Sequence, residues 1–468
     1  MPEQIDSCVG QVDVTERDTA PTKDSAQGHS LSHFLRLLFR LLDEQQVRYC
    51  VLHSWEGLPD TLPSDLDMAV HPQDRANLRL VFQGLGKGGY RPAQCLNYLA
   101  QAYYFVFSWV EDDAVEFARL DVIFEHRRSG LTSLSGEELV AGRERLEGFW
   151  VASPPTEFVY LLAKKTWKRS MPPRQGRRLK LLVEMLGRQQ AEKLAGKVFT
   201  GKLKTEIVEA CVNGSLDGLM GRIGVQPWLT GLVRHPLGLC RFLCGEGTRV
   251  MRRWFQPTGV FLVILGPDGA GKSTLVGRLT QAVGPCFRRQ RIFHWRPNVI
   301  APRKETGVPN TDPHDEPPRG VLGSTVVLLG IFLDCWLGFA FVLRPLLARS
   351  GLVIFDRSYH DLLIDPLRYR YGGPMWLARF LGRLIPAPDL LFLVDAEDEV
   401  ILSRKHEVPP EELRRQREAY QQFALGVKRA NLISTDHGIE LSVGEAARSV
   451  VEYLTRRFQR RHARWLRN

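Results

Sequence analysis

The feature that most constrains this chain is a glycine-rich segment that directly follows a short, wholly apolar run. The run VFLVIL precedes the segment and LVGRLTQAV follows it, so that strand, loop and helix succeed one another. The segment fits the phosphate-loop pattern GxxxxGK(S/T), and its residues are Gly266, Pro267, Asp268, Gly269, Ala270, Gly271, Lys272, Ser273 and Thr274. Glycines let backbone N–H groups turn inward around phosphates, and the helix N-terminus adds partial positive charge. The sequence therefore predicts a nucleotide-phosphate loop in which Lys272 reaches the β- and γ-oxygens and Ser273 is a Mg²⁺ ligand.

Two later apolar runs end in aspartates. GLVIFD ends at Asp356, which Arg357 follows directly, and PDLLFLVD ends at Asp395. Ligands of an open α/β sheet bind beyond the carboxyl ends of its strands, so both acids are candidates to lie near bound phosphates. We expect Asp356 to hold Mg²⁺ or orient the acceptor, and Arg357 to grip a second phosphate. An N-cap role at the helix starting near Glu397 is the alternative for Asp395.

The basic segment ILSRKHEVPPEELRRQREAY is a candidate lid, because its basic residues lie on both sides of a Pro-Pro pair. A mobile basic lid would neutralise charge that spreads over a transferring phosphoryl group. A solvated helix with Glu–Arg pairs is the alternative. Arg404 and Arg417 are the lid candidates.

The loop with its acidic third residue, the strand end FDRSYHD, the strand PDLLFLVDA and the Arg-rich segment follow one another in this order. Together they resemble the thymidylate kinase family of P-loop phosphotransferases, over about residues 258–450. The resemblance implies ATP as phosphoryl donor, Mg²⁺ as cofactor and a small phosphorylated acceptor. The family's loop carboxylate contacts the acceptor sugar, which implies this role for Asp268. The other residues to which the resemblance gives roles are Asp356 and Arg357, for catalysis and the acceptor phosphate, and the lid arginines Arg404 and, less directly, Arg417.

The chain departs from that family where the acceptor would be recognised. The family's Arg-Glu-Pro-Gly segment is replaced by FHWRPNVIAPRKE. Ser358 stands where an aromatic residue usually follows the Asp-Arg pair, and a proline-rich insert occupies 309–320. Phosphoryl transfer is therefore expected, with a nucleoside monophosphate among the candidate acceptors, whereas thymidylate is not assured. His294 and Arg296 are candidates to bind a different acceptor, and a core position is the alternative for His294.

Three aspartates mark a candidate metal site near the N-terminus. Asp65 and Asp67 lie in SDLD at one strand, and Asp121 lies in a later strand, LDVIF. Two acids at i and i+2 share one face of a strand, and a third on a neighbouring strand can complete a carboxylate cage for Mg²⁺. Surface acids at strand ends are the alternative.

This layout resembles the nucleotidyltransferase superfamily, whose Gly-Ser, Asp-x-Asp and later Asp hold two metals and a nucleoside triphosphate. Here His53-Ser54 stands where Gly-Ser is usual. A later helical stretch carries candidate phosphate contacts, with a solvated helix face as the favoured alternative, at Lys164, Lys165 and Lys168.

One long apolar run, Val326 to Leu343, contains a single charge, Asp334. It is at the lower edge of transmembrane length, but an aspartate in mid-bilayer costs about 2.5–3.5 kcal/mol, so we predict a buried helix. The last residues, 455–468, carry six arginines and no acid, with Phe458 and Trp465 interleaved. A frayed basic terminus is the favoured interpretation, and peripheral contact with an anionic membrane is the alternative.

The composition suits a soluble globular protein of two or three domains: 468 residues, 44% hydrophobic and 25% charged, which excludes collagen and overall disorder. The net charge of +11 favours anionic partners, although no nucleic-acid-binding motif accompanies it. The eight scattered cysteines predict reduced thiols, and the polar first residues predict no signal peptide, hence a cytoplasmic protein.

The predicted fold class is α/β, with a C-terminal three-layer parallel sheet of the P-loop kinase kind, a smaller nucleotidyltransferase-like α/β unit and a helical connector. The predicted parts are a disordered tail at 1–30, the N-terminal unit at 31–150, a basic helical connector at 151–257, the P-loop domain at 258–454 and a basic tail at 455–468.

Three functions fit these motifs. The leading one is an ATP- and Mg²⁺-dependent kinase acting on a small phosphorylated acceptor, with a homodimer as a possible assembly. The second adds transfer of a nucleotidyl group to a sugar or a protein by the N-terminal unit. The third is a nucleotide-dependent switch or assembly protein without acceptor chemistry.

Overall fold

The computed structural model of the chain describes residues 30–62, 64–128, 130–168, 172–213, 235–300, 317–404, 410–427 and 430–462, with isolated residues between 219 and 233. The expected tail at 1–30 therefore lies outside the described residues except for Ser30. The chain forms two compact units: a C-terminal unit made mainly of Arg252–Tyr453, and an N-terminal unit made mainly of Ser25–Glu111 and Glu116–Met251.

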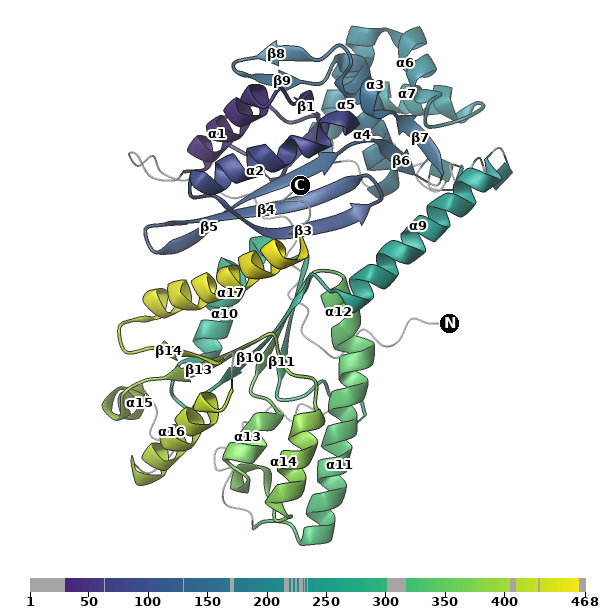
Figure 1. Ribbon diagram of the computed structural model, residues 1–468. Coiled ribbons are helices and arrows are strands. Elements are labelled where there is room, and N and C mark those ends of the chain that lie inside the picture. The colour runs from purple at the N-terminus through teal and green to yellow at the C-terminus, as the bar shows by residue number, and fades with distance from the viewer. Residues whose placement is uncertain are drawn as a thin grey trace. The chain divides into compact units, whose positions relative to one another are not determined.

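The C-terminal unit is built on a five-stranded parallel sheet with helices on both faces (Figure 1). The strand order is β11-β12-β10-β13-β14, so the strand that leads into the glycine-rich loop is central. The α/β class and the parallel sheet are confirmed. The strands are β10 (Val260–Leu265), β11 (Arg289–His294), β12 (Gly351–Asp356), β13 (Leu390–Asp395) and β14 (Ala430–Ser434).

The register of this sheet brings the ends of three strands together. Ile264 of β10 pairs with Asp356 at the end of β12, and His294 at the end of β11 pairs with the same aspartate. Because all strands are parallel, the side chains that follow them gather at one edge of the sheet. The helices around it are α10 (Lys272–Ala282), α11 (Val321–Gly338), η4 (Phe339–Leu343), α12 (Arg344–Ala348), α13 (Tyr359–Ile364), η5 (Leu367–Tyr369), α14 (Met375–Leu384), α15 (Asp398–Arg404), α16 (Pro410–Leu425) and α17 (Ile439–Arg461).

The N-terminal unit contains a seven-stranded mixed sheet in the order β3-β4-β5-β2-β1-β9-β8. Side chains alternate between its two faces: Tyr49 and Val51 belong to one apolar cluster, and Cys50 and Leu52 belong to the other. The strands are β1 (Tyr49–Val51), β2 (Leu66–Val70), β3 (Arg91–Leu99), β4 (Ala102–Glu111), β5 (Ala114–Ile123), β8 (Glu144–Leu146) and β9 (Phe149–Val151). A separate ribbon pairs β6 (His126–Arg128) with β7 (Leu131–Leu134).

Helices cover both faces of this second sheet. The first face packs against α1 (Leu31–Glu44) and α2 (Leu78–Lys87). The helices that were expected to form a connector cover the second face of this sheet instead. They belong to the same compact unit, because their apolar side chains pack in the cluster of Cys50 and Leu52. They are α4 (Pro154–Lys168), α5 (Pro173–Leu186), α6 (Arg188–Ala195) and α7 (Leu203–Asn213). The N-terminal unit also contains the short helices η1 (Pro72–Ala76) and α3 (Gly136–Val140) and most of the long α9 (Pro236–Phe255).

Two segments differ from their predictions. The basic stretch after 455 begins as helix, since α17 continues to Arg461, and Phe458 is buried in the N-terminal unit's core. The apolar run forms one helical rod from Val321 to Ala348, and only 28% of its most apolar stretch is buried. The prediction of a buried helix is therefore wrong for most of the helix surface, because this helix packs against the protein along one side only. By length and hydropathy, this rod is the one candidate membrane span among the described residues.

Candidate functional site

The glycine-rich loop takes the backbone shape that its sequence predicts. Gly266, Gly269 and Gly271 have φ angles of 147°, 86° and 86°, which L side chains rarely adopt. A Cβ at Gly266 would lie 2.1 Å from the carbonyl oxygen of Val394 on β13, so only glycine fits between the two strands. The loop passes directly into α10, whose first residue is Lys272. A loop of this kind followed by a helix N-terminus is a backbone anion site.

Lys272 is the buried cation of this loop. Its side chain is 7% exposed, and its Nζ donates to the carbonyl oxygen of Pro267 at 2.7 Å and lies 3.6 Å from Asp268 Oδ1. Burial, and then the nearby Arg357, lower the pKa of Lys272 to about 8. A buried ammonium beside another cation is stabilised when an anion binds, which is what nucleotide phosphates provide.

Asp268 bridges two arginines. Arg357 Nη2 donates to its Oδ1, and Arg368 Nη1 donates to its Oδ2 at 2.5 Å. Burial alone would raise the pKa of Asp268, but Lys272 and these two arginines hold it well below its usual value. Both carboxylate oxygens are thus engaged by protein groups, and Asp268 orients the arginines. Arg368 lies in η5 and is marked by no sequence motif, so only the fold brings it to the loop.

Ser273 and Asp356 place two oxygen donors side by side at the carboxyl end of β12. Ser273 Oγ donates to Asp356 Oδ2 at 3.3 Å, and His294 Nδ1 lies 3.8 Å from the same oxygen. Burial by itself would raise the pKa of Asp356. The nearby His294 and Lys272 outweigh this effect and lower the pKa below its usual value, which favours the ionised carboxylate. A hydroxyl and a carboxylate are the hard oxygen donors that Mg²⁺ prefers. The side chain of His294 is 60% exposed, so a core position is wrong for it.

Three buried polar atoms at this sheet edge have no hydrogen-bond partner among the described residues: Asp356 Oδ1, Arg357 Nη1 and Trp295 Nε1. Buried polar groups are nearly always paired, so these three atoms offer hydrogen-bonding positions to water or to a polar ligand. Trp295 and Arg357 also have strained positive φ angles of 70° and 73°. The Trp295 ring stacks on Tyr369 at a centroid distance of 4.8 Å. Arg296 lies over the Trp295 ring and 3.9 Å from Asp334, which draws it toward α11.

The two lid candidates have different surroundings. Arg404 lies beside the loop, where it donates to Thr435 Oγ1 and to the Thr435 carbonyl oxygen at 3.1 and 2.9 Å. Thr435 in turn donates to the carbonyl of Ala270 in the loop. Residues 405–409, between the two candidates, lie outside the described residues.

Arg417 is instead engaged by carboxylates. Its Nε and Nη2 donate to the two oxygens of Asp395 at 2.8 and 3.1 Å, and its Nη1 donates to Asp398. Asp395 therefore holds an arginine, and the backbone N–H of Glu397 is capped by Asp436. A lid role for Arg417 would require these ion pairs to open.

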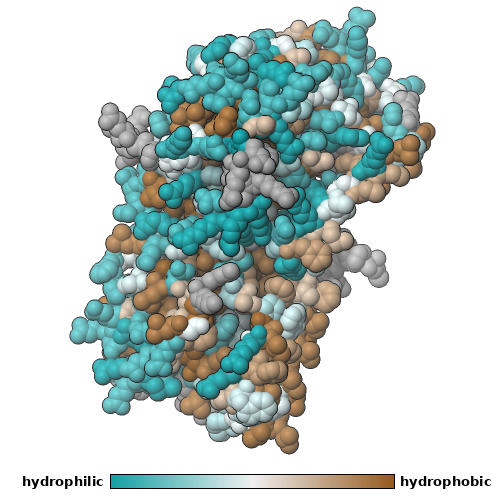
Figure 2. Space-filling model, in the orientation of Figure 1, coloured by the Kyte–Doolittle hydropathy of each residue, from teal (hydrophilic) through white to brown (hydrophobic). Residues whose placement is uncertain are grey.

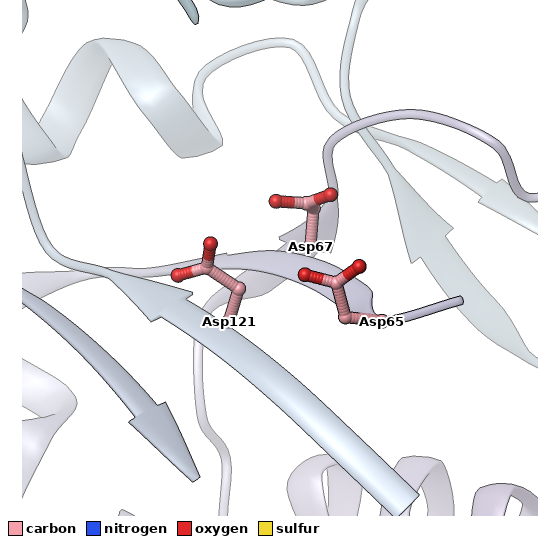
Figure 3. Close-up of side chains that lie close together, drawn as sticks. All are labelled: Asp65, Asp67 and Asp121. Carbon is pink, nitrogen blue, oxygen red and sulfur yellow. The ribbon is translucent and has the colours of Figure 1, made fainter. Parts of the chain in front are cut away.

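The N-terminal aspartates converge. Asp65, Asp67 and Asp121 offer carboxylate oxygens that all lie within 4.8 Å of one another, and Figure 3 shows the three side chains turned toward a common point. The register explains this, because β2 and β5 are parallel and pair Asp67 with Asp121. Burial, and then Asp67, raise the pKa of Asp121.

Protein groups already surround Asp67. Tyr160 donates to its Oδ1 at 2.9 Å, Lys164 donates to the same oxygen, and His53 Nε2 lies 2.8 Å from Oδ2. Lys164 and His53 hold the pKa of Asp67 well below its usual value despite burial. The solvated-face interpretation is wrong for Lys164, whose side chain is 16% exposed. The side chains of Lys165 and Lys168 lie outside the described residues.

No family model and no curated protein matches this chain. Solved structures to which this chain is similar include a thymidylate kinase from Ehrlichia chaffeensis, with 18% identity over 41% of this chain and 98% of that one. Another is a thymidylate kinase from Candida albicans, with 14% identity over 42% of this chain and 91% of that one. The TM-score is 0.30 for each of the two structures.

Proposed function

We propose that the C-terminal unit is an ATP- and Mg²⁺-dependent phosphotransferase that moves a γ-phosphoryl group to a small phosphorylated acceptor. One observation carries this proposal. The buried Lys272 of a left-handed glycine loop adjoins both an oxygen-ligand pair and an arginine pair, so that sites for two anions meet at one sheet edge.

The donor end consists of the loop amides, Lys272, Ser273 and Asp356. The amides and Lys272 bind the phosphate oxygens of the nucleotide. Ser273 Oγ and the unpartnered Oδ1 of Asp356 would hold the metal. When bound, Mg²⁺ supplies charge neutralisation on the phosphate oxygens.

The acceptor end consists of Arg357 and Arg368, which Asp268 orients, and of the Trp295–Tyr369 stack. Two guanidinium groups support a phosphorylated acceptor, and a flat aromatic wall favours a planar base, so a nucleoside monophosphate fits best. In the transfer step an acceptor oxygen forms a bond to the γ-phosphorus, the bond to the bridging oxygen breaks, and ADP leaves with that electron pair. The arginines hold the two reactants in line and stabilise the charge that develops.

A direct test follows γ-labelled ATP in the presence of a panel of nucleoside and sugar phosphates. Label should appear in one class of phosphorylated acceptor, and the transfer should be lost in Lys272→Ala but kept in Arg278→Ala, an exposed arginine on α10. Label released only as inorganic phosphate, at a rate indifferent to every acceptor, would contradict the proposal and favour a nucleotide-dependent switch.

A second function for the N-terminal unit is favoured by the convergence of three carboxylates within 4.8 Å. There an acceptor nucleophile would attack the α-phosphorus of a nucleoside triphosphate, and pyrophosphate would leave. Oxygen donors suit Mg²⁺, but the ammonium of Lys164 would first have to give up its bond to Asp67. Pyrophosphate release that is lost in Asp65→Ala and kept in Lys272→Ala would support this activity; its absence with sugar and protein acceptors alike would exclude it.

A further inference from the structure

An exposed apolar surface runs along two neighbouring helices of the C-terminal unit. The buried stripes of α11 and α14 share one core cluster, in which Leu328 and Ile331 pack with Ala378 and Leu381. Their outer side chains remain exposed, and Figure 2 shows hydrophobic colouring over α11. We call this surface the α11–α14 face, and its exposed members include Leu322, Val326, Leu333, Trp336, Phe341, Trp376 and Phe380. The rod from Val321 to Ala348 is about 42 Å long at 1.5 Å per residue, so the face is larger than the scattered apolar spots of ordinary protein surfaces.

The middle of α11 is fixed to the body of the unit by a buried carboxylate. Asp334 is fully buried, and it accepts the backbone N–H groups of Asn298, Val299 and Ile300 at 2.7–3.0 Å. A helix that crosses a bilayer would have to expose this charge to lipid or carry the attached segment with it. The single aspartate in the apolar run therefore holds the helix against the protein, and the opposite side stays free to contact a surface.

Among the described residues, the charged side chains of α11, α12 and α14 are basic, apart from the buried Asp334. Between Pro317 and Phe355 the sequence has one acidic residue, the buried Asp334, and α14 has none. Arg379 and Arg383 of α14 are exposed beside Trp376 and Phe380. The acidic residues of 301–316 lie outside the described residues.

Exposed aliphatic side chains, two exposed tryptophans and arginines without acids are the composition of a helix face that lies in the interface of an anionic bilayer. We propose that the α11–α14 face docks flat on an anionic lipid surface, with its apolar side chains at the acyl boundary and Arg379 and Arg383 at the headgroups. This places the membrane contact on the C-terminal unit and not on the basic tail, whose Phe458 is buried. The proposal does not depend on the reaction of the neighbouring site.

The test is flotation of the full chain with vesicles of phosphatidylcholine alone or mixed with phosphatidylglycerol. Wild-type protein should float with the mixed vesicles and far less with the neutral ones. The triple variant Leu322→Gln, Val326→Gln and Trp376→Gln should lose this partition by about tenfold or more, because it removes exposed apolar side chains without touching the core. The matched control is Leu146→Gln, Leu425→Gln and Leu441→Gln, three exposed leucines elsewhere, which should float as wild type.

A charge-reversed double variant separates the electrostatic part of the membrane contact from its apolar part. Arg379→Glu with Arg383→Glu should abolish the preference for anionic vesicles, whereas Lys180→Glu with Lys193→Glu, exposed positions of the N-terminal unit, should keep it. Three outcomes would overturn the proposal: wild-type protein that stays unbound with both vesicle types, a triple variant that floats as wild type, or a lipid-free dimer that the triple variant makes monomeric without any vesicle binding.

Discussion

Each unit of this protein holds a largely buried lysine beside an aspartate, and the charges around the two pairs are opposite in sign. In the C-terminal unit Lys272 lies 3.6 Å from an Asp268 that two arginines already hold, so cations are in excess. In the N-terminal unit Lys164 bonds to Asp67 amid two further carboxylates, so anions are in excess.

The pKa directions of the two lysines record this difference. Burial and Arg357 lower the pKa of Lys272 to about 8, whereas Asp67 and Asp121 raise the pKa of Lys164 in spite of burial. A buried lysine among cations favours an incoming anion, such as a phosphate chain. A buried lysine among carboxylates neutralises their charge, as a bound metal cation would. The same two residue types thus suit one site for an anionic ligand and the other for a cation.

The largest effect is expected at the C-terminal lysine. Lys272→Ala should lower phosphoryl transfer from ATP by about a thousandfold, because it removes the buried charge that contacts the transferring group. Labelled ATP measures the rate. Lys164→Ala is the matched variant and should leave this rate within about twofold of wild type. An equal loss of transfer in both variants would contradict the assignment of phosphoryl transfer to the C-terminal lysine.

The N-terminal lysine should matter for stability and for metal binding. Lys164→Met leaves Asp67 without its ammonium, and breaking such a buried pair costs about 3 kcal/mol of unfolding free energy. Mn²⁺ should restore the lost stability, because the cluster then takes a cation in place of the lysine. Thermal unfolding with and without Mn²⁺ measures both effects. A variant as stable as wild type, or one that Mn²⁺ leaves unchanged, would show that Lys164 does not stand in for a cation.

Acid should weaken the C-terminal unit through His360. Burial lowers the pKa of His360 to about 4, so the folded unit keeps it neutral while the unfolded chain protonates near pH 6.5. Its stabilising contribution is complete above about pH 6.5 and is lost as the pH falls toward 4, by at most about 3 kcal/mol. Denaturant unfolding across this range measures the slope. His360→Gln should flatten it, and an unchanged slope in that variant would assign the acid response to other groups.

A smaller effect is expected at the arginine that sequence motifs do not mark. Arg368→Ala should raise the KM for the phosphorylated acceptor about tenfold and leave the KM for ATP unchanged, because one charge-assisted hydrogen-bonding group is lost at the acceptor end only. Steady-state kinetics with each substrate varied in turn separates the two constants. A rise in the KM for ATP instead would move Arg368 to the donor end.

Short sequence motifs predict those site residues that lie at the end of a single strand and in the turn that follows it. The loop from Gly266 to Thr274 and the Asp356–Arg357 pair could be read in this way because short-range geometry determines them. The strand and helix alternation likewise predicted a parallel sheet. The i, i+2 spacing predicts that Asp65 and Asp67 share one face of a strand, but only the parallel pairing of β2 with β5 brings Asp121 beside them.

Contacts between distant segments could not be predicted in the same way. Arg368 reaches Asp268 across 100 positions, and Lys164 reaches Asp67 across 97. Arg417 was expected over the phosphates because it is basic, but the fold supplies Asp395 and Asp398 as its partners. The prediction that the apolar run 326–343 forms a buried helix failed for a related reason. Hydropathy depends on composition alone, whereas tertiary packing determines which side of a helix is buried.

Titration calorimetry of the purified chain with ATP and Mg²⁺ tests the central claim most directly. The claim is that the loop between β10 and α10 grips the terminal phosphates of a nucleotide. The predicted result is saturable uptake of ATP that disappears in Lys272→Ala and persists in Asp65→Ala. Uptake of neither ATP nor GTP by the wild-type chain, or uptake that Lys272→Ala leaves intact, would contradict it.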